Sequence, residues 1–157
     1  MGKLGTVEWI SIIDITTFIG GTVVGWYIHR RITNGRLQKE HLAKEIKNIQ
    51  KEYAATLNDL FTDSFRPQTA LIWFRLINIQ VRNIMKQLKE DYGIDADKLS
   101  PYQQDLRELI TNSPEFNTQY TAIGMLKISE RLRGELLSFQ SAHSHLFNEI
   151  IREINKH

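Results

Sequence analysis

The residue types that could do chemistry are sparse in this chain. There is no cysteine, which excludes disulfides, thiolate metal sites and thiol nucleophiles. His143 and His145 are two residues apart, so on a helix their side chains would point about 200° from each other and could not bind one metal ion together. Gly-x-x-x-x-Gly-Lys, His-Glu-x-x-His and Gly-x-Ser-x-Gly motifs are absent. We therefore expect no metal site and no cofactor.

Two arginine–histidine pairs share the spacing Arg-x4-His. The first is Arg36 and His41, in RLQKEH, and the second is Arg152 and His157, in REINKH. A pair at this spacing arises readily by chance in a chain with this many arginines and histidines. Only the second pair lies on the last helix that the sequence predicts, and that position makes it the candidate catalytic pair.

The charge balance argues against a polyanion-binding protein. The chain has 20 basic and 18 acidic residues, a formal net charge of +2. This balance does not imply a broad basic surface, so we expect no direct nucleic-acid binding. The length of 157 residues leaves room for one modest domain besides a membrane segment.

Residues 9–28 have the pattern of a transmembrane helix. These twenty residues carry one formal charge, and as a helix they would extend roughly 30 Å, the thickness of a bilayer's hydrocarbon core. Trp9 stands at one end and Trp26 at the other, where aromatic rings settle among the lipid headgroups. The alternatives are a cleaved signal peptide and a buried helix of a soluble protein. A signal peptide would carry its positive charge before the apolar run and a small-residue cleavage site after it.

The flanking charges predict the orientation of this segment. His29, Arg30 and Arg31 follow it, whereas its N-terminal side offers only Lys3 against Glu8. The positive-inside rule therefore places residues 1–8 outside and residues 29–157 in the cytoplasm, which for a bacterial protein means a single pass through the inner membrane.

One side of the predicted transmembrane helix is lined by small, hydroxyl-bearing and ionisable residues and one phenylalanine. At 100° per residue an arc of roughly 100° contains Ser11, Asp14, Phe18, Gly21, Thr22, Gly25 and His29. A charged side chain that faces lipid costs at least ~2.5 kcal/mol, so Asp14 should face protein or water. The Gly21-x-x-x-Gly25 spacing allows a neighbouring backbone to approach closely.

A single span must find its partners in other chains, so this arc predicts self-association. The arc could pack in a dimer or line a water-filled lumen, and the sequence does not choose between them. A ring of about eight helices spaced ~10 Å apart would leave a hole some 15 Å wide, whereas four or five would leave almost none.

The remainder of the chain has helical periodicity throughout. Apolar residues recur at three- and four-residue steps from Leu42 to Leu60, and Arg66-Pro67 is expected to end this helix. The segment TALIWFRLINIQVRNIMKQL, residues 69–88, is apolar on more than one face and is expected to be the central helix of a bundle. Its Arg75 and Arg82 argue against a second membrane span.

A loop is predicted at residues 93–99. Ser100-Pro101 and Ser113-Pro114 each combine a helix N-cap with a proline at the first helical position, and Gln103 would complete a capping box. From Ser113 a long amphipathic helix is expected to run to the C-terminus, bent but not ended at Gly124 and Gly134. The prediction is an all-α chain: one N-terminal transmembrane helix and a cytoplasmic helical bundle.

An Arg-x4-His pair on the last helix of an all-helical bundle resembles the HEPN fold, in which such a pair forms a composite ribonuclease site across a dimer. A short HEPN-like chain that begins with one membrane span resembles the small accessory membrane proteins of type VI-B CRISPR systems, which are RNA-guided and RNA-targeting. The resemblance covers the whole layout, and its motif is two residues deep. It implies a homo-oligomeric pore in contact with membrane lipid that strengthens antiviral defence by dissipating the membrane gradient.

The sequence departs from the nuclease pattern at two points. HEPN nucleases usually place Asn, Asp or His after the arginine, and here Glu153 would repel an approaching phosphate. His157 is the last residue, on a terminus expected to fray. If the pair works as in the nucleases, Arg152 would hold the scissile phosphate and His157 would transfer protons at the ribose hydroxyl.

Three functions follow from these observations. The pair is expected to be structural, with Arg152 bonded to Glu149 or to a neighbouring protomer, so the leading hypothesis is a non-enzymatic pore assembled as a higher-order ring. A membrane-tethered HEPN-type ribonuclease is the alternative, and a membrane adaptor that recruits a partner is the third.

Overall fold

The computed structural model describes residues 35–121 and 124–157. These residues are helical apart from their connections and contain no strand, which confirms the predicted all-α class for the part described. The predicted span at 9–28 lies outside the described residues. Within the two described ranges, no helix is both long and apolar enough to cross a membrane.

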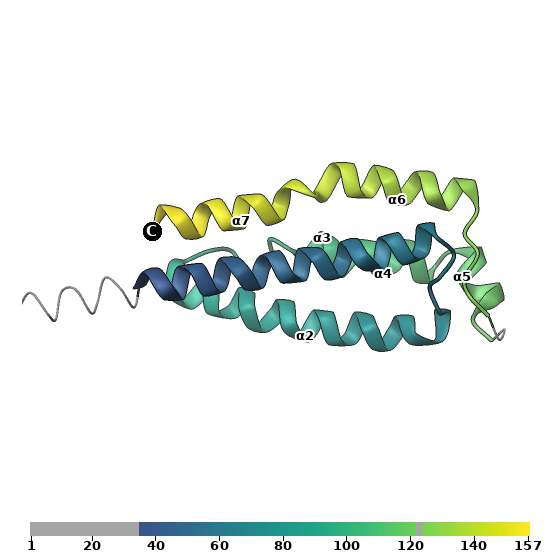
Figure 1. The fold of residues 1–157 in the computed structure, drawn as a ribbon, viewed down its shortest axis with the longest axis horizontal. Helices are drawn as coiled ribbons and strands as arrows, with labels where there is room; N and C mark the ends of the chain where they lie inside the picture. The colour runs from purple at the N-terminus through teal and green to yellow at the C-terminus, as the bar shows by residue number, and fades with distance from the viewer. Residues whose placement is uncertain (1–34, 122–123) are drawn as a thin grey trace, which may run out of the picture. The chain divides into compact units, whose positions relative to one another are not determined.

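A compact helical body begins at His41 and runs to the C-terminus. In Figure 1 its first helix lies between α2 on one side and the α6–α7 pair on the other. The described elements are a helix over 35–61, α2 (Pro67–Tyr92), α3 (Ser100–Gln103), α4 (Asp105–Thr111), α5 (Pro114–Gln119), α6 (Glu130–His143) and α7 (His145–Lys156).

The 41–61 helix supplies one face of the core. The apolar stripe predicted from its periodicity is buried at every position, each side chain at most 2% exposed: Leu42, Ile46, Ile49, Tyr53, Leu57 and Leu60. The helix ends at residue 61, five residues before the predicted end at Arg66, because the chain turns at Thr62 and Asp63. Pro67 instead opens α2, at a position where its missing N–H costs nothing.

An aromatic cluster joins the 41–61 helix to the other elements. The Tyr53 ring lies 5.1 Å from that of Tyr102 in α3 and 5.5 Å, edge-on, from that of Trp73 in α2. Tyr102 in turn lies 4.7 Å from Phe147 in α7 and 5.2 Å from Phe139 in α6, centroid to centroid. Edge-to-face pairs at these distances contribute about 0.5–1.5 kcal/mol each beyond area burial. Burial also raises the pKa of Tyr53, so its hydroxyl stays protonated.

The prediction that residues 69–88 form a central helix, covered on more than one face, is wrong. α2 buries a single stripe at three- and four-residue steps: Pro67, Ala70, Phe74, Ile77, Val81, Met85 and Leu88. Leu71, Ile72, Leu76 and Ile79, between these positions, are exposed, because no other described element covers that side of α2. The helix is therefore peripheral in the body and presents an apolar outer face.

The loop predicted at residues 93–99 is confirmed. Gly93 ends α2 in the left-handed conformation, with φ of 66°, which glycine adopts without steric cost. Its N–H donates to the Lys89 carbonyl at 3.0 Å, and Ile94 N–H donates to the Leu88 carbonyl at 3.3 Å. This is the Schellman arrangement, and it satisfies two carbonyls at the helix end.

The expected long C-terminal helix is three helices, α5, α6 and α7. Residues 120–121 and 124–129 are not helical, because tertiary bonds compete for this backbone: Leu126 N–H donates to the Phe65 carbonyl at 2.7 Å. The Gln119 side chain bonds both the N–H and the carbonyl of Lys127 at 2.9 Å. Gly124 therefore lies in a connection, whereas Gly134 lies inside α6 as predicted.

Serine caps set the starts of α5 and α6. The Ser113 hydroxyl accepts from Phe116 N–H at 3.1 Å, which confirms the predicted cap, but Ser100 makes no cap bond and its helix is only four residues long. Ser129 caps α6 by accepting from Leu132 N–H at 3.2 Å and also donates to the Glu115 carboxylate. That hydrogen bond, with help from Arg131, lowers the pKa of Glu115.

The Tyr53 hydroxyl is buried and has no hydrogen-bond partner among the described residues. This leads to a first prediction. Tyr53→Phe should leave the thermal midpoint unchanged or raise it, because an unpaired buried hydroxyl carries a desolvation cost of about 1–3 kcal/mol. Tyr53→Ala should lower the free energy of unfolding by about 3–5 kcal/mol, since it leaves a cavity among the rings. Circular-dichroism melts of detergent-purified protein measure both. A Tyr53→Phe midpoint several degrees below wild type would mean that the hydroxyl has a partner.

Ser129 generates a second prediction, which depends on pH. A carboxyl whose folded pKa is lowered stabilises the fold above its unfolded value of 4.5, and this stability is lost as the pH falls through the folded pKa. Ser129→Ala should cost about 1 kcal/mol from the lost cap, and a further amount at neutral pH from the lost bond to Glu115. The matched control is Ser141→Ala, at an exposed position inside the same helix.

Chemical denaturation of both serine variants at pH 7 and in acid, below about pH 4, provides the measurement. The gap in unfolding free energy between wild type and Ser129→Ala should narrow in acid, while the control stays near wild type at both values. If the difference in unfolding free energy between wild type and Ser129→Ala were the same at both pH values, the hydrogen bond from Ser129 to Glu115 would contribute nothing to stability.

Candidate functional site

The predicted catalytic pair lies at the C-terminal end of the last helix. Arg152 is in α7 and is exposed, and among the described residues no carboxylate lies within 4 Å of its guanidinium. His157 follows the last residue of α7, and its ring lies 5.9 Å from that of Tyr92 at the end of α2. Burial and the neighbouring Asp91 raise the pKa of Tyr92, so this phenol is a neutral hydrogen-bonding group near the histidine.

Glu153, which was expected to repel a phosphate, has a cationic partner. Lys98, from the loop after α2, forms a salt bridge with Glu153 and lies 3.7 Å from Glu149. Glu149 also lies 3.8 Å from the His145 ring, so the carboxylate proposed as the partner of Arg152 contacts Lys98 and His145. The lysine compensates the local negative charge, and the Arg152 guanidinium is exposed, as is Lys156 one turn further on.

The other histidines are separated by the fold. His143 closes α6, where its Nδ1 lies 3.0 Å from the Phe139 carbonyl, while His145 opens α7. The first Arg-x4-His pair, Arg36 and His41, lies on the 35–61 helix. No group of three His, Cys, Asp or Glu side chains that could hold a metal ion occurs within 35–121 and 124–157.

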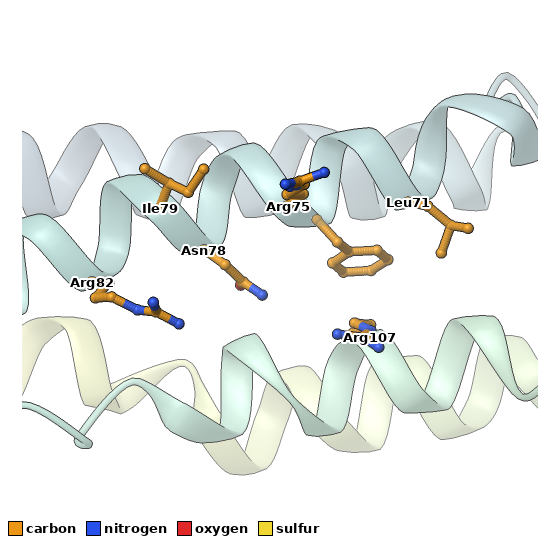
Figure 2. Close-up of a pocket in the computed structure, with 7 residues that line it drawn as sticks. Leu71, Arg75, Asn78, Ile79, Arg82 and Arg107 are labelled. Carbon is orange, nitrogen blue, oxygen red and sulfur yellow. The ribbon is translucent and has the colours of Figure 1, made fainter.

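A groove between α2 and α4 was not predicted from the sequence. This α2–α4 groove has a volume of about 510 Å³ and is lined by Leu71, Phe74, Arg75, Asn78, Ile79, Arg82 and Arg107. Figure 2 shows Asn78 and Arg82 directed from α2 toward α4, and Arg107 directed back from the opposite wall. An adjoining pocket of about 320 Å³ shares Asn78, Arg82 and Arg107 with the groove.

The groove is cationic because its arginines have no acidic partners nearby. In the described part of the chain no carboxylate lies within 4 Å of the guanidinium of Arg75, Arg82 or Arg107. Asn78 Oδ1 is buried and has no hydrogen-bond partner among these residues. The groove therefore offers three guanidinium groups to whatever occupies it.

One signal in the sequence could have indicated this groove. Arg75, Asn78 and Arg82 recur at three- and four-residue steps, so they share a face of any helix that contains them. In the sequence the two arginines argue against a second membrane span, and their shared face is a second consequence of the same spacing. Arg107 comes from another helix, and its place opposite them could not be inferred from spacing.

The residues predicted to line a pore or a helix–helix contact fall outside the described residues. They are Ser11, Asp14, Phe18, Gly21, Thr22, Gly25 and His29. Their arrangement remains the one inferred from helical periodicity.

Comparisons with known proteins identify no relative. No protein-family model, curated protein or solved structure matches this chain. The resemblance to HEPN proteins and to the accessory membrane proteins of type VI-B CRISPR systems thus rests on the layout of the chain and on Arg152 and His157.

Proposed function

We propose that the protein is a single-pass protein of the bacterial inner membrane that assembles through copies of itself into a pore. In this proposal the ring dissipates the membrane gradient and thereby strengthens RNA-guided, RNA-targeting antiviral defence. The link to an RNA-guided effector comes from the resemblance alone.

One observation carries the pore: Asp14 lies inside an apolar run of membrane-spanning length. Ionisable residues within a span face a bundle interior or a water-filled cavity, and they mark ion pathways. Asp14 shares its arc with hydroxyl groups and with the Gly21-x-x-x-Gly25 spacing, which favours close contact between spans. A shared lumen would keep the carboxylate hydrated and would favour cations.

The helical body supplies a second line of support. The helix that follows the predicted span is continuous from residue 35 to residue 61, and its 41–61 part is buried in the core. In this proposal the helix over 35–61 is the route by which the cytoplasmic body influences the span.

The pore proposal is tested at Asp14. Asp14→Leu should retain expression, membrane insertion and particle size, because leucine is apolar and the glycine face is unchanged. It should reduce ion flux through reconstituted vesicles and loss of membrane potential in infected cells. Ile13→Leu, on the opposite side of the helix, is the matched control and should conduct like wild type. Unchanged flux through Asp14→Leu vesicles would return the aspartate to a packing role.

Assembly is measured in the same experiment by the mass of the detergent-purified particle. Wild type should form a higher-order ring, and Gly25→Leu should weaken it by holding the backbones apart. A wild-type monomer in mild detergent would overturn the proposal.

A membrane-tethered ribonuclease is the second candidate, favoured by the Lys98–Glu153 salt bridge. That bridge offsets the charge that would otherwise repel a phosphate beside Arg152. In a ring, two copies of the C-terminal end of α7 could form a composite site, as the HEPN resemblance implies. The Lys98–Glu153 salt bridge favours the ribonuclease only through its effect on local charge, and it does not itself form a substrate-binding surface.

Arg152→Ala and His157→Ala separate the two candidates. If the pair is catalytic, purified wild type cleaves RNA without metal, and each substitution removes the activity; loss of proton transfer alone costs ~10² to 10⁴ in rate. The pore proposal instead expects no cleavage by wild type, and any loss of defence should follow loss of oligomer. Lys156→Ala, exposed in the same helix, is the matched control. Metal-independent cleavage that both variants lose with the ring intact would establish the ribonuclease.

A further inference from the structure

The outer face of α2 is apolar over a short length. Four of the seven exposed large hydrophobic residues of the described chain lie between positions 71 and 79, and their exposed fractions are 44–63%: Leu71, Ile72, Leu76 and Ile79. The remaining three, Leu37, Met125 and Leu137, lie singly on different segments. A contiguous aliphatic face of this kind marks a surface that contacts another molecule.

The α2–α4 groove lies directly beside this face. Leu71 and Ile79 belong both to the exposed aliphatic set and to the lining of the groove, which also holds Arg75, Arg82 and Arg107. Figure 2 shows Leu71 and Ile79 along the same stretch of α2 as the two α2 arginines. An occupant therefore meets aliphatic and cationic side chains together, and complementarity requires apolar and acidic groups on one surface.

Neither a nucleic acid nor a membrane fits this combination. A phosphate backbone would satisfy the arginines, but single strands bind by stacking on aromatic rings, and the exposed apolar residues of α2 are all aliphatic. A lipid surface contacts the convex face of an amphipathic helix. Here the cationic residues come from both walls of a groove, because Arg107 lies on α4 and faces the two arginines of α2 across it.

A second copy of the chain is also a poor match. A symmetric contact of this patch with itself would require carboxylates within the patch, and among the described residues that line the groove and the adjoining pocket the acidic one is Glu108. Many of the other glutamates in the described residues already have basic partners in their own chain, among them Glu115, Glu135, Glu149 and Glu153.

We propose that the α2–α4 groove and the aliphatic face beside it bind an acidic amphipathic helix of another protein. Leucine or isoleucine side chains of that helix would cover Leu71, Leu76 and Ile79, and its carboxylates would bind the groove arginines. Arginine suits this role because its planar guanidinium binds a carboxylate with two parallel hydrogen bonds.

The spacing of the arginines matches a helical partner. Arg75 and Arg82 are seven residues apart, so they are separated by about 10 Å along α2. Carboxylates seven residues apart on a partner helix lying along α2 have the same separation and also share one face with apolar residues three or four positions away. Binding an amphipathic helix in a groove is a common mode of protein recognition.

The test uses the full-length protein in detergent and a fluorescent synthetic peptide of about 18 residues, long enough to be helical. Leucines at three- and four-residue steps form its apolar face, and glutamates flank them; a second peptide carries lysines in place of the glutamates. The variant Arg75→Glu/Arg82→Glu is compared with Lys44→Glu/Lys51→Glu. The control reverses two exposed charges that are also seven residues apart on a helix.

Fluorescence anisotropy should show that wild type and the Lys44→Glu/Lys51→Glu control both bind the glutamate peptide. Both proteins should bind the lysine peptide only weakly. The arginine variant should bind the glutamate peptide at least about tenfold more weakly, in keeping with the coupling energies of close charge pairs. It should bind the lysine peptide more tightly than wild type does. That gain shows that the groove is intact, so loss of binding through misfolding is distinguished from loss of charge.

Several outcomes would overturn the proposal. Equal binding of the glutamate peptide by wild type and by the arginine variant would remove the groove from the interaction. Another outcome is that wild type binds a short polyuridine RNA, or phosphatidylglycerol added to the micelles, and binds neither peptide. If only the arginine variant then lost that binding, the groove would be assigned to phosphate groups. A smaller particle for the arginine variant, again without peptide binding by wild type, would assign it to a second copy of the chain.

Discussion

The contact between Tyr53 and its neighbouring rings is the constraint on which the helical body depends. Tyr53 is 1% exposed and contacts aromatic rings of α2, α3 and α7. The cluster fixes the rotation of α2 about its own axis, since Trp73 and Phe74 must both face inward. Once that rotation is set, the three- and four-residue periodicity of α2 leaves Leu71, Ile72, Leu76 and Ile79 exposed and places Arg75 and Arg82 along the α2–α4 groove. A feature of the core thus determines the chemistry of the surface.

Much of the fold could be predicted from the sequence because it depends on local patterns. The buried stripe from Leu42 to Leu60 and the loop at Gly93 are consequences of helical periodicity and of glycine's access to the left-handed region. The break after α5 could not be predicted, because it depends on Leu126 bonding a carbonyl that is distant in sequence, at Phe65. Local helix propensity is a weak preference, and tertiary hydrogen bonds of this kind override it.

The prediction that α2 is central was wrong for a different reason, and the same reason limited what the sequence could predict about the sites. A helix that is apolar on two faces was expected to be central, yet periodicity does not say whether the second face meets the same chain or another one. The same limit applies to Glu153, whose partner Lys98 is 55 residues away and leaves no spacing signal. It applies again to Arg107, which completes the groove from a separate helix. The N-terminal arc is the converse case, because its polar residues are close in sequence and periodicity alone groups them.

The groove and the predicted span contain charges of opposite sign: three arginines in the groove and Asp14 in the span. Three guanidinium groups that share a groove repel one another. A carboxylate of the same chain within reach would offset this repulsion, but it would also occupy the arginines and so prevent them from binding a partner. Their lack of acidic partners in the described residues leaves the groove able to discriminate among partners by charge, while the aliphatic residues supply the area that a stable contact needs. α2 packs on the 41–61 helix, where Trp73 contacts Tyr53. A helix bound at α2 could therefore bias the proposed pore, but only by as much as its affinity differs between the open and closed assemblies, with about 1.4 kcal/mol for each tenfold difference.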